Sequence, residues 1–502
     1  MKTLRHSVFW PPFLFLLLSV SYSLYDLEGF TTKATALNGF LLDRFGWLYS
    51  LSTLAFLAIC LSVYFSPLAQ VRIGGPEAQP LLSRWRWFAI TLCTTIAVGI
   101  LFWGTAEPLY HLHQPPSGLN IAPNSIDAMR FSMSTMFLHW TLIPYGIYTT
   151  AGLLFALMYY NYRRPFSLGS LLYPLLGEYT EGALGRVIDA FCLYSLVAGM
   201  AASLGAGILT IAGGLESLLG WESSGLLLGM ITLAIVTVFV ISAASGLLQG
   251  IRLLSDWNIK AFFLLAIFVL VTGPTLFVLK IGVEGLGDFF QHFFQKSLYV
   301  GLTPEDNWSE SWTIFYWANW LAWTPVTALF LGRLALGYTV REFIQFNLFY
   351  PSLFGAMWMI IFGGTTLYLD FFAAADSPMY QILQEGGPEN VIYGVFERLP
   401  LSGLMSTLFL GITFLSFVTA SDSNTSAMSG LSAQGISPDS PEPSIVIKVV
   451  WGITVGAVAW TMVNFAGIDG IKMASNLGGF PILFLMILVA AALVKVMRNP
   501  QL

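Results

Sequence analysis

Five aromatic side chains stand at spacings that could bind an organic cation within a membrane. Trp320 and Trp323 are three residues apart and share a helix face. A second apolar segment contributes Trp140, Tyr145 and Tyr148. Facing indole and phenol rings attract a desolvated quaternary ammonium group through their quadrupoles, and each contact contributes roughly 0.5 to 2 kcal/mol. A lipid-facing belt, or rings that pack helices together, explains the same spacing, and spacing alone favours that alternative.

A second group of candidate ligands lies in a hydroxyl-rich segment, TLFLGITFLSFVTASDSNTSAMSG, which is too polar to face lipid. It holds Ser416, Thr419 and Ser421, and Asp422 is an acid at membrane depth. Hard cations such as sodium take carbonyl and hydroxyl oxygens, which become available where a broken helix meets a helix rich in Ser and Thr. Interhelical hydrogen bonding by the same side chains is the competing interpretation.

Membrane helices must hold these residues. Of the 502 residues, 56% are hydrophobic and 10% are charged, whereas an ordinary soluble domain carries about 25% charged residues. A span needs about 20 apolar residues, and on this basis the sequence predicts an all-α integral membrane protein with about twelve transmembrane helices. They are placed at 6–25, 46–68, 88–112, 130–160, 185–215, 222–246, 258–282, 312–336, 344–372, 400–433, 444–467 and 475–497.

The loop charges predict the orientation. An even number of spans puts both termini on one side, and the short loops on that side are rich in arginine. Because basic loops stay in the cytoplasm, we expect both termini to be cytoplasmic and the protein to lie in the cytoplasmic (inner) membrane. The arginines in question are Arg72, Arg84, Arg86, Arg163, Arg164, Arg252, Arg333 and Arg341.

Two spans are interrupted at matching places. The third, 88–112, carries Gly104 and Pro108 near its outer end, and the eighth, 312–336, places Pro325 mid-membrane. They lie five spans apart, so spans three to seven and eight to twelve form two inverted sets of five. Discontinuous first helices in inverted repeats are typical of secondary transporters with a site at the midplane. Packing kinks explain such breaks equally well.

The chain therefore divides into five predicted parts. A tail with two accessory helices precedes two five-helix repeats, an outer amphipathic helix with its loop separates the repeats, and a short cytoplasmic tail follows. Their bounds are 1–86, 87–282, 283–311, 312–497 and 498–502. The amphipathic helix should lie in the membrane plane, packed on its own protein or on another subunit, with an apolar side formed by Phe289, Phe290, Phe293, Phe294 and Leu298.

The sequence does not support nucleic-acid binding, a thiolate metal site or an enzyme. A net charge of -5 gives no basic footprint for nucleic acid. The cysteines all lie in apolar segments, which supports neither a disulfide framework nor a thiolate metal site. Only His139 lies deep in a span, without a metal-ligand partner at sequence spacing, whereas His111 and His113 are expected to be solvated. We expect neither an enzyme nor a cofactor, and short tails leave an ion or solute gradient as the energy source.

Two long motifs carry a resemblance to a known family. They are GILFWGTAEPLYH at 99–111 and WTIFYWANWLAWTPVTALFLGRLALGYTVREFI at 312–344, with weaker agreement at RFGWLYSL, LLYPLLGE, SLGAGILTIAGGLE, SGLLQGIRLLSDWN and FVTASDS. The chain resembles the betaine/carnitine/choline transporter (BCCT) family over nearly its full length.

The resemblance implies a LeuT-like five-plus-five inverted repeat after two extra helices, usually in a homotrimer surrounded by lipid. It implies transport of compatible solutes with a quaternary ammonium or related onium group. When the family's binding positions are carried over to this sequence, the substrate would be bound by an aromatic box. Its residues are Trp140, Tyr145, Tyr148, Trp320 and Trp323. A sodium site would combine backbone oxygens near Cys93 and Ile96 with Ser416, Thr419 and the neighbouring Ala420 and Ser421 of the tenth span.

Several positions depart from the family pattern. Asn319 replaces a further Trp of the eighth span, so it could hydrogen-bond a substrate hydroxyl or carboxylate, and Tyr145 replaces a Trp of the fourth. The glycine-rich stretch of the third span, here with Ala97 and Gly99, contains no acid. Family members that favour choline tend to carry an Asp there, so an uncharged stretch suits a zwitterion better.

The proposed sodium sites contain fewer hydroxyl ligands than the family pattern. The usual Thr-Ser pair is Thr419 with Ala420, although Ser421 could substitute. Hydroxyls of a second sodium site are replaced by Leu196 and Met200, which puts a second sodium in doubt. Asn258 stands where sodium-independent exchangers of the family carry an Arg, so a mobile cation is still expected.

The sequence thus favours sodium symport of a betaine-type solute by alternating access. A sodium-independent exchanger or a proton-coupled carrier of choline, carnitine or a sulfonium analogue is the alternative. In that case Asp422 or Glu107 would titrate, although the expected role of each is an N-cap or a hydrogen bond that holds a broken helix.

Overall fold

The computed structural model describes residues 4–95, 97–244, 248–303, 305–373, 377–436 and 444–499. Across these ranges the regular structure is helical, and the β-type pairing is limited to two isolated bridges, Leu4 with Ala433 and Arg72 with Thr339. The prediction of an all-α protein is therefore confirmed.

Seven helical segments of the described chain are long and apolar enough to cross a membrane, or eight if one bent pair counts as a single span. Their bounds are His6–Tyr25 (α1), Leu27–Phe65 (α2), Ile126–Asn161 (α5, α6 and η3), Ala183–Leu219 (α8), Val340–Phe371 (α14 to α16), Ser402–Leu431 (α19) and Ile445–Arg498 (α20). The chain is thus a multi-pass membrane protein. The predicted eleventh and twelfth spans both lie within α20, which is interrupted at Gly467, where φ is 50°.

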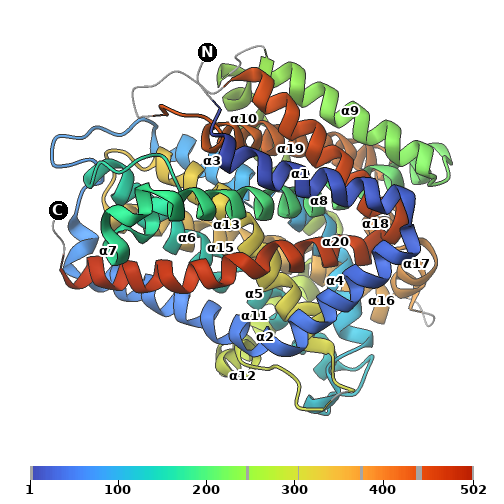
Figure 1. Cartoon of the computed structure of the whole chain (residues 1–502). Helices are drawn as coiled ribbons and strands as arrows, with labels where there is room; N and C mark the ends of the chain where they lie inside the picture. Colours follow the sequence, from blue (N-terminus) through green and yellow to red (C-terminus); the bar gives the residue numbers. More distant parts are fainter. Residues whose placement is uncertain are drawn as a thin grey trace.

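Helices α1 and α2 form a hairpin beside the rest of the bundle. The turn lies at Asp26, whose side chain accepts a hydrogen bond of 2.9 Å from the backbone N–H of Gly29 at the start of α2. Both helices contact α20, and α1 also contacts α8, as Figure 1 shows. Many apolar side chains of the hairpin are exposed, as expected for helices that face lipid.

The third predicted span is covered by helix α3 (Arg84–Thr95) and helix α4 (Ala97–His113), and Ile96 between them lies outside the described residues. The fourth predicted span is divided. The break in the fourth span was not predicted: α5 (Ile126–Trp140) and α6 (Leu142–Ala156) are separated at Thr141, with φ -125° and ψ -116°. Trp140 thus ends one helix while Tyr145 and Tyr148 lie on the next, so the three rings can approach one point from different directions.

The predicted interruption of the eighth span is wrong. Helix α13 (Phe315–Leu334) runs without a break through Pro325. The hydroxyl of Thr324 donates to the Trp320 carbonyl oxygen at 2.9 Å, and that of Thr327 to the Thr324 carbonyl oxygen at 3.0 Å. Threonine side chains of this kind satisfy backbone groups near a proline in a membrane helix.

The amphipathic helix begins earlier than predicted. Helix α10 (Leu248–Thr272) ends before Pro274, and α11 (Thr275–Gln291) continues after a bend of 108°. Of the five apolar side chains, Phe289 is buried, whereas Phe290, Phe294 and Leu298 are exposed.

Lys296 fixes the short helix α12 (Phe293–Ser297) to α5. Its ammonium lies 2.6 Å from the Ser134 hydroxyl and 3.1 Å from the Asp288 carboxylate. Burial lowers the pKa of Lys296 to about 8, against the opposing effect of Asp288.

The remaining helices complete the bundle. Their bounds are Tyr173–Leu176 (α7), Gly225–Ala244 (α9), Val340–Ile344 (α14), Tyr350–Trp358 (α15), Gly364–Phe371 (α16), Pro378–Gly386 (α17) and Pro388–Glu397 (α18).

Candidate functional site

Four of the five predicted aromatic residues meet at Trp320. Its ring centroid lies 5.6 Å from that of Trp140, 5.5 Å from that of Tyr145 and 5.1 Å from that of Tyr148. All three contacts are edge-to-face, the arrangement that aromatic quadrupoles prefer. All four side chains are buried, so α5, α6 and α13 enclose one aromatic cluster. The lipid-belt alternative does not apply to these four residues.

Two donors in this cluster have no hydrogen-bond partner among the described residues: the indole N–H of Trp320 and the hydroxyl of Tyr145. A buried donor without a partner loses its hydration without compensation, which costs about 1 to 3 kcal/mol. These two groups are therefore suited to bind an acceptor such as a carboxylate.

Trp323 is directed elsewhere. Its indole N–H donates to the hydroxyl of Ser203 on α8 at 3.0 Å. No ring contact joins it to the other four rings in the described part of the chain. Sharing a helix face with Trp320 thus did not bring it into the cluster.

The neighbouring predicted residues have separate contacts. Asn319 is partly exposed and its side-chain oxygen accepts a hydrogen bond of 3.1 Å from Ser475 on α20. Gly99 allows the close approach of α4 to the cluster, because a Cβ at that position would lie 2.7 Å from the Trp140 ring. The side chain of Ala97 lies outside the described residues.

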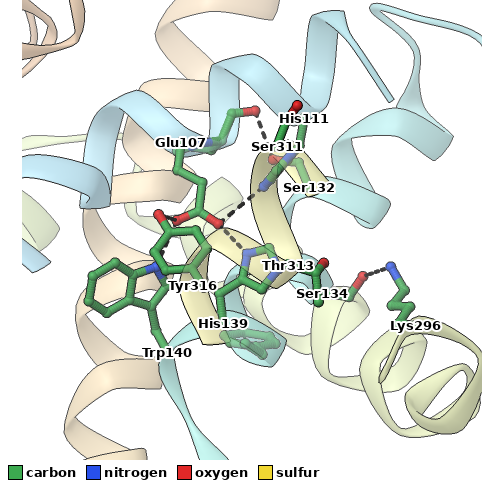
Figure 2. Close-up of polar contacts among 12 residues, drawn as sticks. Glu107, His111, Ser132, Ser134, His139, Trp140, Lys296, Ser311, Thr313 and Tyr316 are labelled. Carbon is green, nitrogen blue, oxygen red and sulfur yellow. Dashed lines mark hydrogen bonds and ion pairs between the residues drawn. The ribbon is translucent and has the colours of Figure 1, made fainter. Parts of the chain in front are cut away.

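A buried carboxylate that the sequence did not predict as a site residue holds the cluster from one side. Glu107 on α4 accepts hydrogen bonds from Trp140 Nε1 at 2.7 Å and from the Tyr316 hydroxyl at 2.6 Å (Figure 2). Its other oxygen contacts His139 Nδ1 at 2.7 Å and His111 Nε2 at 3.1 Å. Glu107 thus joins the third, fourth and eighth spans.

The expectation that His111 is solvated is wrong, because its side chain is fully buried. His113 is also largely covered and contacts the Asp370 carboxylate at 2.7 Å. The spacing of four residues between Glu107 and His111 was the one available signal in the sequence. The contact with His139 spans a long stretch of chain and could not be found from spacing.

Glu107, His111 and His139 also bring ligand atoms within 4.8 Å of one another, a grouping that could hold a metal ion. The sequence had indicated no such grouping. However, both oxygens of Glu107 already accept two hydrogen bonds each. A buried carboxylate needs these donors to remain in a low-dielectric environment, so hydrogen bonding accounts for the cluster.

The hydroxyl-rich part of α19 packs against α10. Ser416 Oγ accepts a hydrogen bond of 2.8 Å from Asn258 Nδ2, and the other side-chain atom of Asn258, Oδ1, is buried without a hydrogen-bond partner. Thr419, Ala420 and Ser421 are also buried on α19. Cys93 (its side chain) and Ile96 lie outside the described residues. The unpartnered Asn258 Oδ1, at this contact between α10 and α19, is the kind of oxygen ligand that hard cations take.

Comparison with known proteins assigns the chain to a family. The model of the betaine/carnitine/choline family transporters matches residues 7–502. The chain is 30% identical over 498 residues to the glycine betaine transporter OpuD of Bacillus subtilis (strain 168), covering 98% of this chain and 94% of that protein. It is 28% identical over 505 residues to the ectoine/hydroxyectoine transporter of Virgibacillus pantothenticus, covering 100% of this chain and 98% of that protein. The chain therefore belongs to the betaine/carnitine/choline transporter family and is a multi-pass membrane transporter, not an enzyme.

Proposed function

We propose that the protein takes up a betaine-type compatible solute with a quaternary ammonium group, by sodium symport and alternating access. The observation that carries this proposal is the convergence of Trp140, Tyr145 and Tyr148 on the ring of Trp320, at centroid distances of 5.1 to 5.6 Å. Desolvated rings of this kind attract a quaternary ammonium group. The name of the Bacillus subtilis relative, a glycine betaine transporter, supports the same class of solute.

The residues of the aromatic cluster differ in whether a hydrogen bond fixes their side chains. Glu107 fixes Trp140 through its indole N–H. Trp320 and Tyr145 have no such hydrogen bond among the described residues. Because the other three rings each contact Trp320, a trimethylammonium group can enter between them only if rings separate. We infer that Trp320 and Tyr145 move while Trp140 stays in place.

The unpartnered donors favour a zwitterion over a bare cation. A substrate carboxylate can accept from the Tyr145 hydroxyl and the Trp320 indole N–H while its onium group lies against the rings. Asn319, which is partly exposed beside Trp320, is a further donor for a substrate hydroxyl or carboxylate. The ectoine relative indicates that a zwitterion without a quaternary ammonium group remains within the substrate class.

Sodium coupling is supported by the chemistry at the contact of α10 with α19. Ser416, Thr419 and Ser421 offer oxygens, with backbone oxygens near Cys93 and Ile96 as the proposed remainder of the site. The buried Asn258 Oδ1 is one more oxygen in reach of Ser416. Leu196 and Met200 provide no hydroxyls for a second site, so we propose a single site. Sodium is carried cargo here, and no resident cofactor is proposed.

The alternative is a sodium-independent exchanger or proton-coupled carrier of choline, carnitine or a sulfonium analogue. One observation favours it: the amide of Asn258 already donates to Ser416, which is the hydroxyl expected to bind the ion. A polar side chain in that position can hold α10 to α19 without a cation.

The architecture that we propose for this cycle is the LeuT-like five-plus-five inverted repeat. The repeats are 87–282 and 312–497, with accessory helices in 1–86, the amphipathic helix in 283–311 and a short tail at 498–502. We propose twelve spans in a cytoplasmic membrane, both termini on the cytoplasmic side, and a homotrimer in contact with lipid. Rocking of one bundle against the rest would expose the midplane site to each side in turn.

Uptake of radiolabelled glycine betaine into proteoliposomes tests the proposal. An inward sodium gradient should drive accumulation, and potassium in place of sodium should abolish it. Unlabelled onium compounds are added as competitors to rank the substrates. Uptake that ignores sodium but rises with substrate preloaded in the lumen favours the exchanger, and an absence of uptake of every onium compound contradicts the proposed substrate class.

A further inference from the structure

A lysine lies among aromatic side chains beside the proposed substrate site. Lys472 is on α20, five residues beyond the interruption at Gly467. Its ammonium nitrogen is 4.1 Å from the ring centroid of Trp312, 5.5 Å from that of Phe315 and 5.8 Å from that of Trp103. At these distances the ammonium makes a cation–π contact with the Trp312 ring in particular.

The hydrogen bonding of Lys472 is incomplete. The ammonium group has three N–H donors, and in the described part of the chain it has one hydrogen bond, of 3.2 Å, to the backbone oxygen of Ser311. No carboxylate of the described residues forms an ion pair with it, and the side chain is partly buried. Lys472 is therefore an ammonium group with donors available for an anionic group, and the carboxylate of Asp469, one helical turn before it, attracts its charge without an ion-pair contact.

Continuous ring contacts connect this lysine with the aromatic cluster. Trp312 contacts Trp103 at 5.6 Å, Trp103 contacts Tyr316 at 6.1 Å, and Tyr316 contacts Trp140 at 5.3 Å between centroids. In the proposed orientation α13 begins, and the second part of α20 follows Gly467, at the outer side of the membrane. Lys472 thus lies between the outer surface and Trp140.

We propose that Lys472 is a specificity-determining residue that favours zwitterions carrying a carboxylate over solutes with a net positive charge. This inference rests on the proposed function and orientation. A fixed charge on the outer side of a binding site attracts opposite charge and repels like charge, and it does so more strongly at low ionic strength. The lysine also covers the Trp312 ring with its own ammonium, so a bare cation gains nothing from that ring.

The test compares full-length variants in proteoliposomes. Choline inhibition of labelled glycine betaine uptake is measured for the wild type, Lys472→Met and Lys472→Arg, with Lys280→Met as the control. Lys280 is an exposed lysine on α11, so its replacement removes one charge without altering the surroundings of Lys472. The readout is the ratio of the choline concentration that halves uptake to the KM for glycine betaine.

In Lys472→Met this ratio should fall roughly two- to fivefold, the range expected for one partly exposed charge, and high salt should shrink the difference. Lys472→Arg and Lys280→Met should keep the wild-type ratio. An unchanged ratio in Lys472→Met, or an equal fall in Lys472→Arg, overturns the role of the charge while leaving the proposed function intact. A wild type that takes up no glycine betaine overturns both.

Discussion

The indole N–H of Trp140 donates a hydrogen bond of 2.7 Å to the carboxylate of Glu107, which lies on a different helix. The same carboxylate oxygen accepts from the Tyr316 hydroxyl at 2.6 Å. A ring of the proposed substrate site is therefore oriented by a buried charge on α4, and not by packing alone. This relationship makes Glu107 a positioning residue, since its effect on a solute would act through Trp140.

Glu107→Gln should lower both stability and transport. The amide keeps the shape of the side chain but puts an NH2 group where a carboxylate oxygen accepted two hydrogen bonds. Disrupting a buried network of this kind costs about 3 kcal/mol, so the melting temperature should fall, and the KM for glycine betaine should rise as Trp140 loses its orientation.

Thermal unfolding of the purified variant and uptake kinetics check this expectation. Glu305→Gln is the matched control, because Glu305 is exposed and should tolerate the change. A Glu107→Gln protein with wild-type KM would contradict the positioning role.

The two neighbouring tryptophans of α13 should differ in importance. Trp320 contacts three rings, whereas Trp323 donates to Ser203 on α8. Trp320→Leu should raise the KM for glycine betaine about tenfold, which corresponds to the loss of one or two onium contacts. Trp323→Leu should raise it less than about threefold. Trp257→Leu, at an exposed position of α10, serves as the control. Equal effects of Trp320→Leu and Trp323→Leu on the KM would contradict the placement of Trp320, but not Trp323, in the substrate site.

Removing one hydroxyl should distinguish how the carboxylate and the onium group of the substrate each contribute to binding. Tyr145→Phe keeps the ring but deletes the buried hydroxyl that has no partner in the described chain. Affinity for glycine betaine should fall at least about tenfold, as expected for the loss of one hydrogen bond to a charged group. Inhibition by tetramethylammonium, which has no carboxylate, should not change. Competition assays with both compounds measure the difference, and a parallel loss for both would argue against a carboxylate contact.

Replacing oxygens at the contact of α10 with α19 should change the sodium requirement. Ser416→Ala and Asn258→Ala each remove an oxygen at this contact. The sodium concentration for half-maximal uptake should rise about fivefold in each, corresponding to about 1 kcal/mol. Thr407→Ala, at an exposed position of the same helix, is the control. Sodium curves that match the wild type in both variants would favour the exchanger.

The aromatic cluster illustrates what the sequence could and could not predict. The resemblance to the family placed Trp140, Tyr145, Tyr148 and Trp320 together, and the structure brings their rings into one cluster. The same reasoning included Trp323, whose indole turns to a hydroxyl on α8 that no local pattern reveals. A shared helix face limits where a side chain can point but does not decide which neighbour it contacts.

The Glu107 cluster shows a second limit. Its members come from α4, α5 and α13, and buried hydrogen bonds between distant segments depend on how helices pack. Helix continuity was also misjudged, since Pro325 lies inside an unbroken α13 whereas Thr141, without Gly or Pro beside it, separates α5 from α6. Side-chain hydroxyls and tertiary contacts outweighed local propensity at both places.

The most direct test of the central claim compares glycine betaine with 3,3-dimethylbutanoate, in which carbon replaces the quaternary nitrogen while shape and carboxylate remain. Both are measured as competitors of labelled glycine betaine binding to the purified protein in sodium. If Trp140, Tyr145, Tyr148 and Trp320 bind the onium charge, glycine betaine should bind at least about tenfold more tightly, and Trp320→Leu should reduce this preference. Equal affinity of the two compounds for the wild-type protein would contradict the claim.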